Sequence, residues 1–313
     1  METLAVVLQE PENLGLQRLD LPAPGDGDVV VDVEWSGIST GTERLLWSGR
    51  MPHFPGMGYP LVPGYESVGR VSWAGSSTQI RVGERVFVPG ANCYGAVRGL
   101  FGGTASRVVL PGARAIPIAE SLGEKGILFA LAATGYHAAF SDKGVAADLI
   151  VGHGVLGRLI ARIAIASGAP APTVWEKNST RFGGSMGYQV IDPDQDPRRD
   201  YRVICDVSGD SSILDALVSR LAPGGEIILA GFYADRLSFS FPPAFMKEAR
   251  MRAAAQWQKA DLIAVKDLVE SGRLSLDGLI THRSTADGAP SAYRTAFEDP
   301  ACLKMVLDWR SCA

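Results

Sequence analysis

The sequence predicts an α/β protein of two domains, in which a β-rich domain precedes a doubly wound parallel sheet. Three observations lead to this prediction. Short β-branched runs separated by Gly and Pro fill residues 1–120. From residue 121 to 245, strand-like and helix-like segments alternate. A Gly-x-Gly-x-x-Gly loop stands between a strand and a helix at residues 152–157.

Residues 1–120 contain several short runs that are typical of strands. Frequent Gly and Pro turns between the runs indicate a barrel-like β domain. The runs comprise residues 4–8, 29–34, 67–71, 85–88 and 106–110. The turns comprise residues 22–25, Gly37, residues 55–56, 63–64 and 89–90.

Residues 121–245 alternate between apolar strands and amphipathic helices. This order predicts parallel strands that are joined by crossover helices. The strands are expected at residues 149–151, 173–176, 188–191, 203–206 and 226–230, with helices at 154–167 and 211–221. A further helix is expected at residues 260–271, before Gly272, and a closing strand at 304–309.

The composition excludes several classes of protein. A chain of 313 residues suggests about two domains. The net charge of −4 gives no electrostatic case for a nucleic-acid partner. No apolar run approaches the ~20 residues of a membrane span, and the N-terminus does not resemble a signal peptide. The cysteines form no C-x-x-C pair and indicate a reducing, cytoplasmic location; they are Cys93, Cys205, Cys302 and Cys312.

The glycine loop predicts a dinucleotide site. Gly152 permits a tight turn, Gly154 lets the backbone approach a pyrophosphate, and Gly157 lets the helix lie close to the sheet. The helix then begins at Val155 and Leu156, where free N–H groups favour phosphate. The middle residue, His153, is expected to face solvent or the cofactor.

The nucleotide is predicted to be NAD. Glu176 ends the next expected strand, where a carboxylate accepts hydrogen bonds from ribose hydroxyls and repels a 2′-phosphate. Lys177 and Arg181 lie nearby and keep NADP open as an alternative.

Two later turns complete the expected cofactor site. Ser208 and Gly209 follow one strand, and Gly231 follows the next. In an open parallel sheet, ligands bind beyond the carboxyl ends of the strands. Ordinary strand-to-helix turns would show the same residues, so both interpretations remain open.

Several motifs resemble those of the medium-chain dehydrogenase/reductase superfamily. They are Gly-Ile-Ser-Thr-Gly-Thr-Glu at 37–43, Pro-Gly-Tyr-Glu at 63–66, Gly-Glu-Arg-Val at 83–86, Thr-Gly-Tyr at 134–136, and Gly-Gly-Glu at 224–226. The resemblance implies a GroES-like substrate domain, formed by residues 1–120 and 246–313, and a Rossmann NAD-binding domain at 121–245. It also implies that Thr134 contributes to the cofactor site.

The chain departs from this family at the metal-binding positions. Zinc enzymes of the family carry a Cys, a His and a third ligand where this sequence has Ser39 or Thr40, Tyr65 and Ala130. Zinc prefers thiolate, imidazole or carboxylate ligands. Only Cys93 stands where the family has a four-cysteine structural zinc loop. The sequence therefore predicts an enzyme without a metal.

A longer similarity narrows the expected substrate. The chain resembles the dehydrogenases of bacteriochlorophyll synthesis in residues 36–43, 46–52, 54–66, 88–93, 99–103 and 241–249. This resemblance implies NAD-dependent oxidation of the 3-(1-hydroxyethyl) group of a bacteriochlorophyllide to 3-acetyl, so that the partner is a chlorin-type small molecule. It also suggests a homodimer. Peripheral membrane contact is an expectation, because the pigment partitions to membranes, although no amphipathic basic helix supports it.

Four residues are candidates for handling the alcohol proton. Thr42 matches the family's hydroxyl relay position, and Tyr65 takes the place of the metal-binding His beside Glu66. A tyrosine of ordinary pKa, ~10, can donate a hydrogen bond without any shift, whereas service as a base needs a lowered pKa. His53 is the fourth candidate, because imidazole titrates near neutrality. Each has a structural alternative: packing, helix capping or a loop position.

The chlorin is large, flat and apolar, so we expect aromatic side chains in its site. Candidates from the aromatic segment and a later loop are Trp47, Phe54, Tyr59 and Phe101. A loop anchored on its own core is the competing interpretation.

Two other functions compete with this one. Zinc-free members of the superfamily include quinone and enoyl reductases, but those usually favour NADPH, which Glu176 opposes. A non-enzymatic cofactor-binding protein would also fit the altered metal positions.

Overall fold

The computed structural model describes residues 1–312 and divides into two compact units. The first unit comprises Met1–Ala130 and the C-terminal segment from Leu279, and the second comprises Leu131–Gly278.

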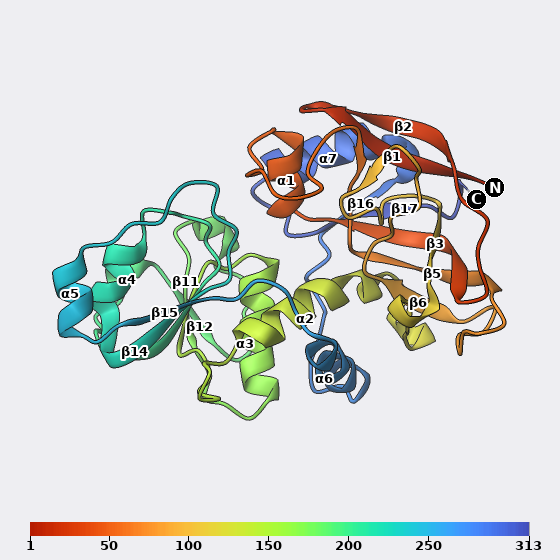
Figure 1. Ribbon diagram of the computed structural model, residues 1–313. Coiled ribbons are helices and arrows are strands. Elements are labelled where there is room, and N and C mark those ends of the chain that lie inside the picture. The colour runs from red at the N-terminus through yellow and green to blue at the C-terminus, as the bar shows by residue number, and fades with distance from the viewer. Residues whose placement is uncertain (313) are drawn as a thin grey trace. The chain divides into compact units, whose positions relative to one another are not determined.

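The first unit is built from two sheets (Figure 1). The larger sheet has the order β16 (His282–Thr285), β17 (Met305–Asp308), β3 (Asp28–Ile38), β5 (Ser67–Ala74), β6 (Arg85–Val88) and β9 (Ile116–Pro117), with β8 (Arg107–Pro111) paired to β3. The smaller sheet has the order β2 (Asn13–Asp20), β1 (Glu2–Glu10), β4 (Leu61–Val62) and β7 (Arg98–Gly99). Its helical segments are α1 (Thr42–Trp47), α7 (Ala289–Glu298), η1 (Gly112–Arg114), η2 (Glu120–Leu128) and η5 (Ala286–Gly288).

Strand β3 lies at the centre of the first unit's core. It pairs antiparallel with β5, β8 and β17, and its valines Val29–Val31 are buried. The C-terminal strand β17 closes one side of β3. Trp309 follows β17, is fully buried, and donates its indole N–H to Ser36 Oγ at 2.8 Å. The C-terminal segment is therefore an integral part of this core.

The second unit is a six-stranded, fully parallel sheet. Its order is β12 (Gln189–Ile191), β11 (Thr173–Trp175), β10 (Leu149–Val151), β13 (Tyr201–Asp206), β14 (Leu221–Leu229) and β15 (Arg250–Ala253). Its helical segments are α3 (Val155–Ala166), α4 (Leu214–Arg220), α5 (Phe241–Met246), α6 (Lys259–Glu270), η3 (Ser179–Arg181) and η4 (Pro193–Gln195), and α2 (Phe129–Ala138) spans the division between the units.

The strand order reverses between β10 and β13, which is the point where such sheets bind ligands. Helices α4 and α5 lie on one face of the sheet and α3 on the other (Figure 1). Leu214 and Leu217 of α4 join Ile204 and Ile227 of the sheet in one buried cluster. The predicted fold class, a β-rich domain with a doubly wound parallel sheet, is confirmed.

The division between the units differs from the boundaries expected at residues 120 and 245. Residues 246–278 were expected in the β domain, but they lie in the second unit. Strand β15 extends the parallel sheet by pairing with β14, and Asp261 of α6 contacts His137 Nδ1 at 3.0 Å. The first boundary falls inside α2, after Ala130.

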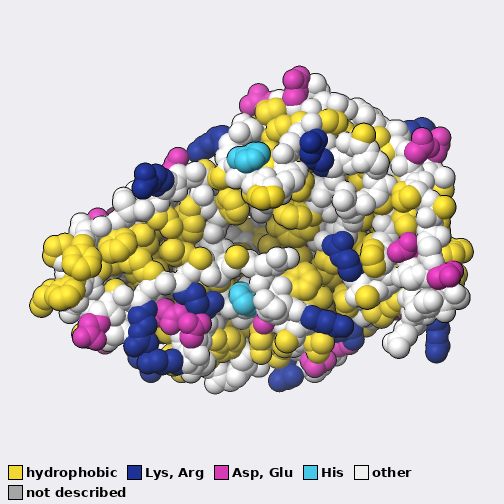
Figure 2. Space-filling model, viewed as in Figure 1, with side chains coloured by type: hydrophobic (Ala, Val, Ile, Leu, Met, Phe, Trp, Pro, Cys, Tyr) yellow, Lys and Arg dark blue, Asp and Glu magenta, His cyan; other side chains and the backbone are white. Residues whose placement is uncertain are grey.

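Helix α5 presents an exposed apolar surface. Phe241, Phe245 and Met246 are 66%, 65% and 77% exposed, and Figure 2 shows hydrophobic side chains gathered over this helix. Surfaces of this kind often mark a contact with a partner or membrane. Among residues 1–312, no helix is both long and apolar enough to span a bilayer.

Candidate active site

Three hydroxyl groups meet in the first unit. Ser39 Oγ lies 2.8 Å from Tyr65 Oη, and Thr42 also hydrogen-bonds Tyr65. Ser39 directly follows β3 and precedes the turn at 40–41, Thr42 begins α1, and Tyr65 follows Pro63 and Gly64. Burial and the nearby Glu66 carboxylate raise the pKa of Tyr65. Tyr65 therefore stays protonated and acts as a hydrogen-bonding hydroxyl rather than as a base.

The positions that would carry zinc ligands hold a different set of atoms. Of the two alternatives for the first position, Ser39 is the one whose side chain contacts Tyr65. Two hydroxyls and the methyl group of Ala130 do not match the donors that zinc selects. Within residues 1–312, no group of three His, Cys, Asp or Glu side chains could hold a metal ion. The residues present do not fit a catalytic zinc.

Glu66 forms a buried ion pair with Lys304. The ammonium nitrogen lies 2.7 and 3.0 Å from the two carboxylate oxygens and also donates to the Ile38 carbonyl, and both side chains are at most 1% exposed. Burial raises the pKa of Glu66, while the Lys304 ammonium opposes that rise. A Cβ at Gly37 would lie 2.4 Å from Glu66 Oε2, so this approach requires glycine. These contacts favour the structural alternative for Glu66 over a role as the base.

A second buried carboxyl group, Glu43, lies beside the hydroxyls. Its Oε1 accepts a hydrogen bond from the Ser39 N–H at 3.0 Å, and its Oε2 accepts one from the Tyr293 hydroxyl at 2.6 Å. Burial raises the pKa of Glu43 to about 7. Glu43 thus fixes the turn that carries Ser39 and changes charge near neutral pH.

The remaining candidates of this unit separate into two groups. Trp47, Phe54 and Tyr59 pack against a small buried cluster around Leu46, and the Tyr59 hydroxyl donates to the Leu46 carbonyl. The competing interpretation, a loop anchored on its own core, describes these three. Phe101 instead is 42% exposed and packs edge-on against Tyr65, with ring centroids 5.4 Å apart. It is therefore the aromatic candidate beside the hydroxyls.

His53 lies apart from the other catalytic candidates. It is exposed in the segment after α1. Among the described residues, no hydrogen bond or ion pair joins it to Thr42, Tyr65 or Glu66. The structure therefore does not bring His53 together with the hydroxyls of Ser39, Thr42 and Tyr65.

The glycine loop of the second unit has the geometry that a pyrophosphate requires. Gly152 has φ +105°, which favours glycine. A Cβ at Gly157 would lie 1.9 Å from the Gly152 carbonyl oxygen, so α3 can approach the strand only with glycine there. Gly154 caps α3 and has open space where its Cβ would stand. Val155 and Leu156 form the first turn, whose N–H groups have no partner within the helix.

Glu176 stands at the carboxyl end of β11, as predicted. Its Oε2 accepts a hydrogen bond from the His153 backbone N–H at 3.0 Å, and its Oε1 accepts one from the Asn178 N–H at 2.8 Å. Each carboxylate oxygen keeps a further lone pair for a ligand hydroxyl. The expectation that the His153 side chain faces solvent or cofactor is wrong, since this side chain is fully buried.

The other predicted cofactor residues follow the neighbouring strands. Ser208 and Gly209 come after β13, and the backbone of Ser208 lies beside Gly152. Gly231 comes after β14, and a Cβ there would lie 3.1 Å from the Gly209 nitrogen. Thr134 is half-buried on α2, which packs on α3 at Gly135. The strand-end turns at 152, 208–209 and 231 thus form one group.

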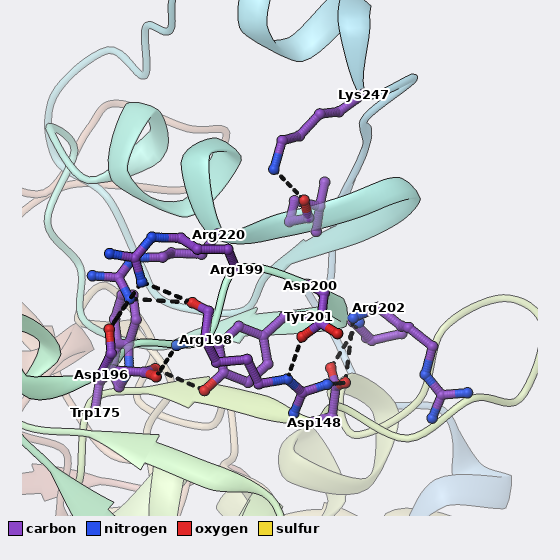
Figure 3. A network of polar contacts seen from close by, with 12 residues as sticks. Asp148, Trp175, Asp196, Arg198, Arg199, Asp200, Tyr201, Arg202, Arg220 and Lys247 are labelled. Carbon is purple, nitrogen blue, oxygen red and sulfur yellow. Dashed lines mark hydrogen bonds and ion pairs between the residues drawn. The ribbon is translucent and has the colours of Figure 1, made fainter.

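A polar network supports β11 and β13 from the edge of the sheet where β10 and β13 begin (Figure 3). Buried Asp196 accepts hydrogen bonds from Trp175 Nε1 and the Tyr201 hydroxyl, both at 2.7 Å. The Arg198 guanidinium lies over the Tyr201 ring and pairs with Asp148. Since Trp175 precedes Glu176, this network holds the strand that positions the acidic side chain.

Sequence reasoning missed three residues of the first unit's site: Lys304, Glu43 and Tyr293. Lys304 was noted only as the first residue of the expected closing strand, although a lone lysine beside a strand as apolar as β17 suggests a buried charge. Glu43 was noted only as the last residue of the motif at 37–43, and nothing in the sequence indicates its contact with Tyr293, which joins residues 250 positions apart.

Comparisons with known proteins find relatives over the whole length of the chain. Residues 25–120 match the family model of the alcohol dehydrogenase GroES-like domain. The chain is 55% identical over 311 residues to a 2-desacetyl-2-hydroxyethyl bacteriochlorophyllide A dehydrogenase of Rhodobacter capsulatus, with 99% of both chains covered. It is 56% identical to the protein of the same name from Cereibacter sphaeroides, with 100% of both chains covered.

Two solved structures have a similar fold. A short chain alcohol dehydrogenase from Escherichia coli CFT073, complexed with cofactor NADH, matches with TM-score 0.85 and 22% identity over 98% of this chain and 99% of that one. A putative zinc-binding dehydrogenase from Sinorhizobium meliloti bound to NADP matches with TM-score 0.81 and 21% identity, at the same coverage.

Proposed function

Because the chain belongs to the 2-desacetyl-2-hydroxyethyl bacteriochlorophyllide A dehydrogenases, within the medium-chain dehydrogenase/reductase superfamily, we propose that it oxidises the hydroxyethyl group of a bacteriochlorophyllide to acetyl with NAD and without zinc. The observation that carries the metal-free part is the Ser39–Tyr65 hydroxyl pair at 2.8 Å, in place of two metal ligands.

The cofactor proposal depends on Glu176 and the glycine loop. NAD, when bound, accepts the hydride of the alcohol carbon at C4 of its nicotinamide ring. Open space at Gly154 leaves room for a pyrophosphate, and the first turn of α3 supplies N–H donors. The Glu176 carboxylate would accept hydrogen bonds from the adenosine ribose and repel a 2′-phosphate. These features support NAD over NADP.

The three hydroxyls of the first unit bind the alcohol oxygen and carry its proton. Ser39, Thr42 and Tyr65 carry three O–H protons, and two of them are used in bonds to Tyr65. One proton remains to donate a hydrogen bond to a ligand oxygen, where negative charge develops as the carbon loses hydride. The alcohol proton passes to one of these hydroxyl oxygens as that hydroxyl releases its own proton, and solvent water is the final acceptor. Because its pKa is raised, Tyr65 serves as donor and relay.

The exposed α5 surface supports a macromolecular contact. We place a homodimer contact or peripheral membrane contact on this face, in a cytoplasmic protein. Sedimentation velocity and vesicle flotation distinguish the two, and a Phe241→Ser, Phe245→Ser variant should lose whichever is observed.

The decisive experiment is turnover. Purified protein, with hydroxyethyl bacteriochlorophyllide a and NAD, should yield NADH and the acetyl pigment in equal amounts. NADP should support a rate at least about tenfold lower, because of Glu176. Exhaustive chelation should leave the rate unchanged. Loss of activity on chelation with recovery on added zinc would overturn the metal-free proposal, and equal rates with NADP would overturn the cofactor proposal.

A further inference from the structure

The middle residue of the glycine loop carries a fully buried imidazole. His153 is 0% exposed, although the glycines on either side of it are not. Its Nδ1 lies 2.6 Å from the Arg181 carbonyl oxygen, and its Nε2 lies 2.9 Å from the Tyr188 hydroxyl. The imidazole ring meets the Tyr188 ring edge-on, with centroids 5.6 Å apart. A buried group bonded at both nitrogens has a fixed orientation.

These partners define the protonation state of His153. A carbonyl oxygen only accepts, so Nδ1 must carry the hydrogen. A proton on Nε2 as well would place a buried cation beside the Arg158 and Arg162 guanidiniums. Burial is the main reason that the pKa of His153 is lowered to about 4, and both guanidiniums add to the effect. Nε2 is therefore an acceptor, and the Tyr188 hydroxyl donates to it.

Arg158 of α3 completes a cycle of hydrogen bonds that includes His153 and the Arg181 carbonyl. Its Nε donates to the His153 carbonyl and its Nη2 to the Arg181 carbonyl, each at 3.1 Å. Gly184, with φ +79°, leaves room for this side chain, since a Cβ there would lie 2.2 Å from Arg158 Nη1. The Arg181 carbonyl is thus held by one donor from the glycine loop and one from α3.

This cycle of hydrogen bonds is connected directly to Glu176, the acidic residue of the cofactor site. The His153 backbone N–H donates to Glu176 Oε2, while its side chain holds the segment that begins two residues after Glu176. That segment's Asn178 N–H holds Glu176 Oε1. His153 therefore holds one oxygen of the Glu176 carboxylate directly, and it holds the segment that bonds the other oxygen through the Arg181 carbonyl.

We propose that His153, as the neutral Nδ1–H tautomer, is a positioning residue for the adenosine end of the dinucleotide, because it locks residues 178–184 to the glycine loop and so orients Glu176. The proposal rests on the proposed cofactor. It assigns His153 no contact with the reacting atoms, so it should act on affinity and leave the chemical step unchanged.

The test measures binding of ADP-ribose, which carries the adenosine half of NAD and supports no turnover. His153→Leu removes both hydrogen bonds and should weaken binding at least tenfold, or about 1.4 kcal/mol. His153→Asn places an amide N–H near the Nδ1 position and should stay within about threefold of wild type. His137→Asn is the matched control, because His137 lies in the same unit and bonds Asp261 instead. Its affinity should not change.

Three outcomes separate the two proposals. Equal ADP-ribose affinity in wild type and a folded His153→Leu variant would overturn the positioning role. Nicotinamide mononucleotide, which lacks the adenosine half, should bind all variants equally, and a parallel loss of its affinity would also overturn the role. Wild type that binds 2′-phospho-ADP-ribose as tightly as ADP-ribose would instead overturn the NAD preference, and the variants are then compared on that ligand.

A second measurement determines the tautomer of His153 in the wild-type protein, and variants serve only to assign and perturb its signals. Long-range ¹H–¹⁵N correlation spectra assign the tautomer of each of the four histidines, and His153→Asn identifies the His153 signals. We expect a protonated Nδ1 and an unprotonated Nε2 at neutral pH. Tyr188→Phe should shift the Nε2 resonance and leave the tautomer in place. A protonated Nε2 in wild type would overturn the proposal.

Discussion

The two units hold their functional groups by different means. In the second unit, backbone atoms dominate: three glycines shape the loop, and two N–H groups hold Glu176. In the first unit, buried side chains hold one another, through Glu66–Lys304, Glu43–Tyr293 and Ser39–Tyr65. A backbone site depends on the space that glycine leaves, whereas a side-chain site depends on matched partners. Substitutions should therefore fail in different ways in the two units.

The largest effect should come from separating the buried ion pair. Lys304→Met leaves the Glu66 carboxylate buried without its partner and should lower the free energy of unfolding by about 3–5 kcal/mol. Combining it with Glu66→Gln should restore much of this loss, as urea unfolding would reveal. Arg18→Met, which removes the exposed pair with Glu2, should change it by at most about 1 kcal/mol. If the Lys304→Met, Glu66→Gln double variant were no more stable than Lys304→Met, the loss would not come from an unpaired Glu66 carboxylate.

Loss of the tyrosine hydroxyl should affect the chemical step. Tyr65→Phe is expected to lower kcat about 10²–10³-fold, because it removes a donor to the developing oxygen charge. The Kd for NAD should stay constant, since Tyr65 belongs to the first unit. Tyr94→Phe is the control, because it also removes a buried hydroxyl, which bonds the Gly102 carbonyl. A similar fall in kcat for both variants would indicate a structural effect.

The two units should respond to pH in opposite directions. Glu43 has its pKa raised to about 7 in the folded protein, so it stabilises less as pH rises from 4.5 to 7. His153 has its pKa lowered to about 4, so folding weakens as pH falls from 6.5 to 4. Each shift corresponds to about 3 kcal/mol at most.

Matched variants isolate these contributions. Glu43→Gln should abolish the loss of unfolding free energy near neutral pH that peptides of the first unit report. His153→Asn should abolish the corresponding loss at acid pH in peptides of the second unit. Hydrogen exchange with mass spectrometry across a urea series reports each unit separately. Unchanged pH dependence in either variant would mean that other groups produce it.

The smallest effects should distinguish two glycines of one loop. Gly157→Ala forces a Cβ against the Gly152 carbonyl and should destabilise the protein by about 1–3 kcal/mol. Gly154→Ala meets no protein atom and should cost at most about 1 kcal/mol of unfolding free energy. Its NAD affinity should nevertheless fall at least about tenfold, since the methyl group enters the space left for pyrophosphate. Retention of full affinity would exclude that placement.

The backbone-held site was largely predictable, because its signals are local. The glycines lie within six residues, and the acidic residue follows at the end of the next strand. The His153 side chain was misjudged, because burial of a residue between two glycines depends on Arg181 and Tyr188 from a later segment.

The side-chain site was only partly predictable. The motifs indicated Thr42 and Tyr65, but Lys304 meets Glu66 across 238 residues, and no local pattern encodes that contact. The domain boundary expected at residue 245 was wrong for a related reason. Strand β15 has two arginines among four residues, so it does not resemble a buried strand; it is an edge strand of the sheet.

The return of the chain to β3 determines the order of folding during synthesis. Strand β17 lies between β16 and β3, and Lys304 supplies the charge opposite Glu66. The first 130 residues therefore carry an incomplete core until the last segment has been made, whereas the parallel sheet of residues 131–278 already has all its strands. The unit encoded first is thus completed last. In the interval, the edge of β3 and the Glu66 side chain, which the complete fold buries, are exposed to chaperones and to aggregation.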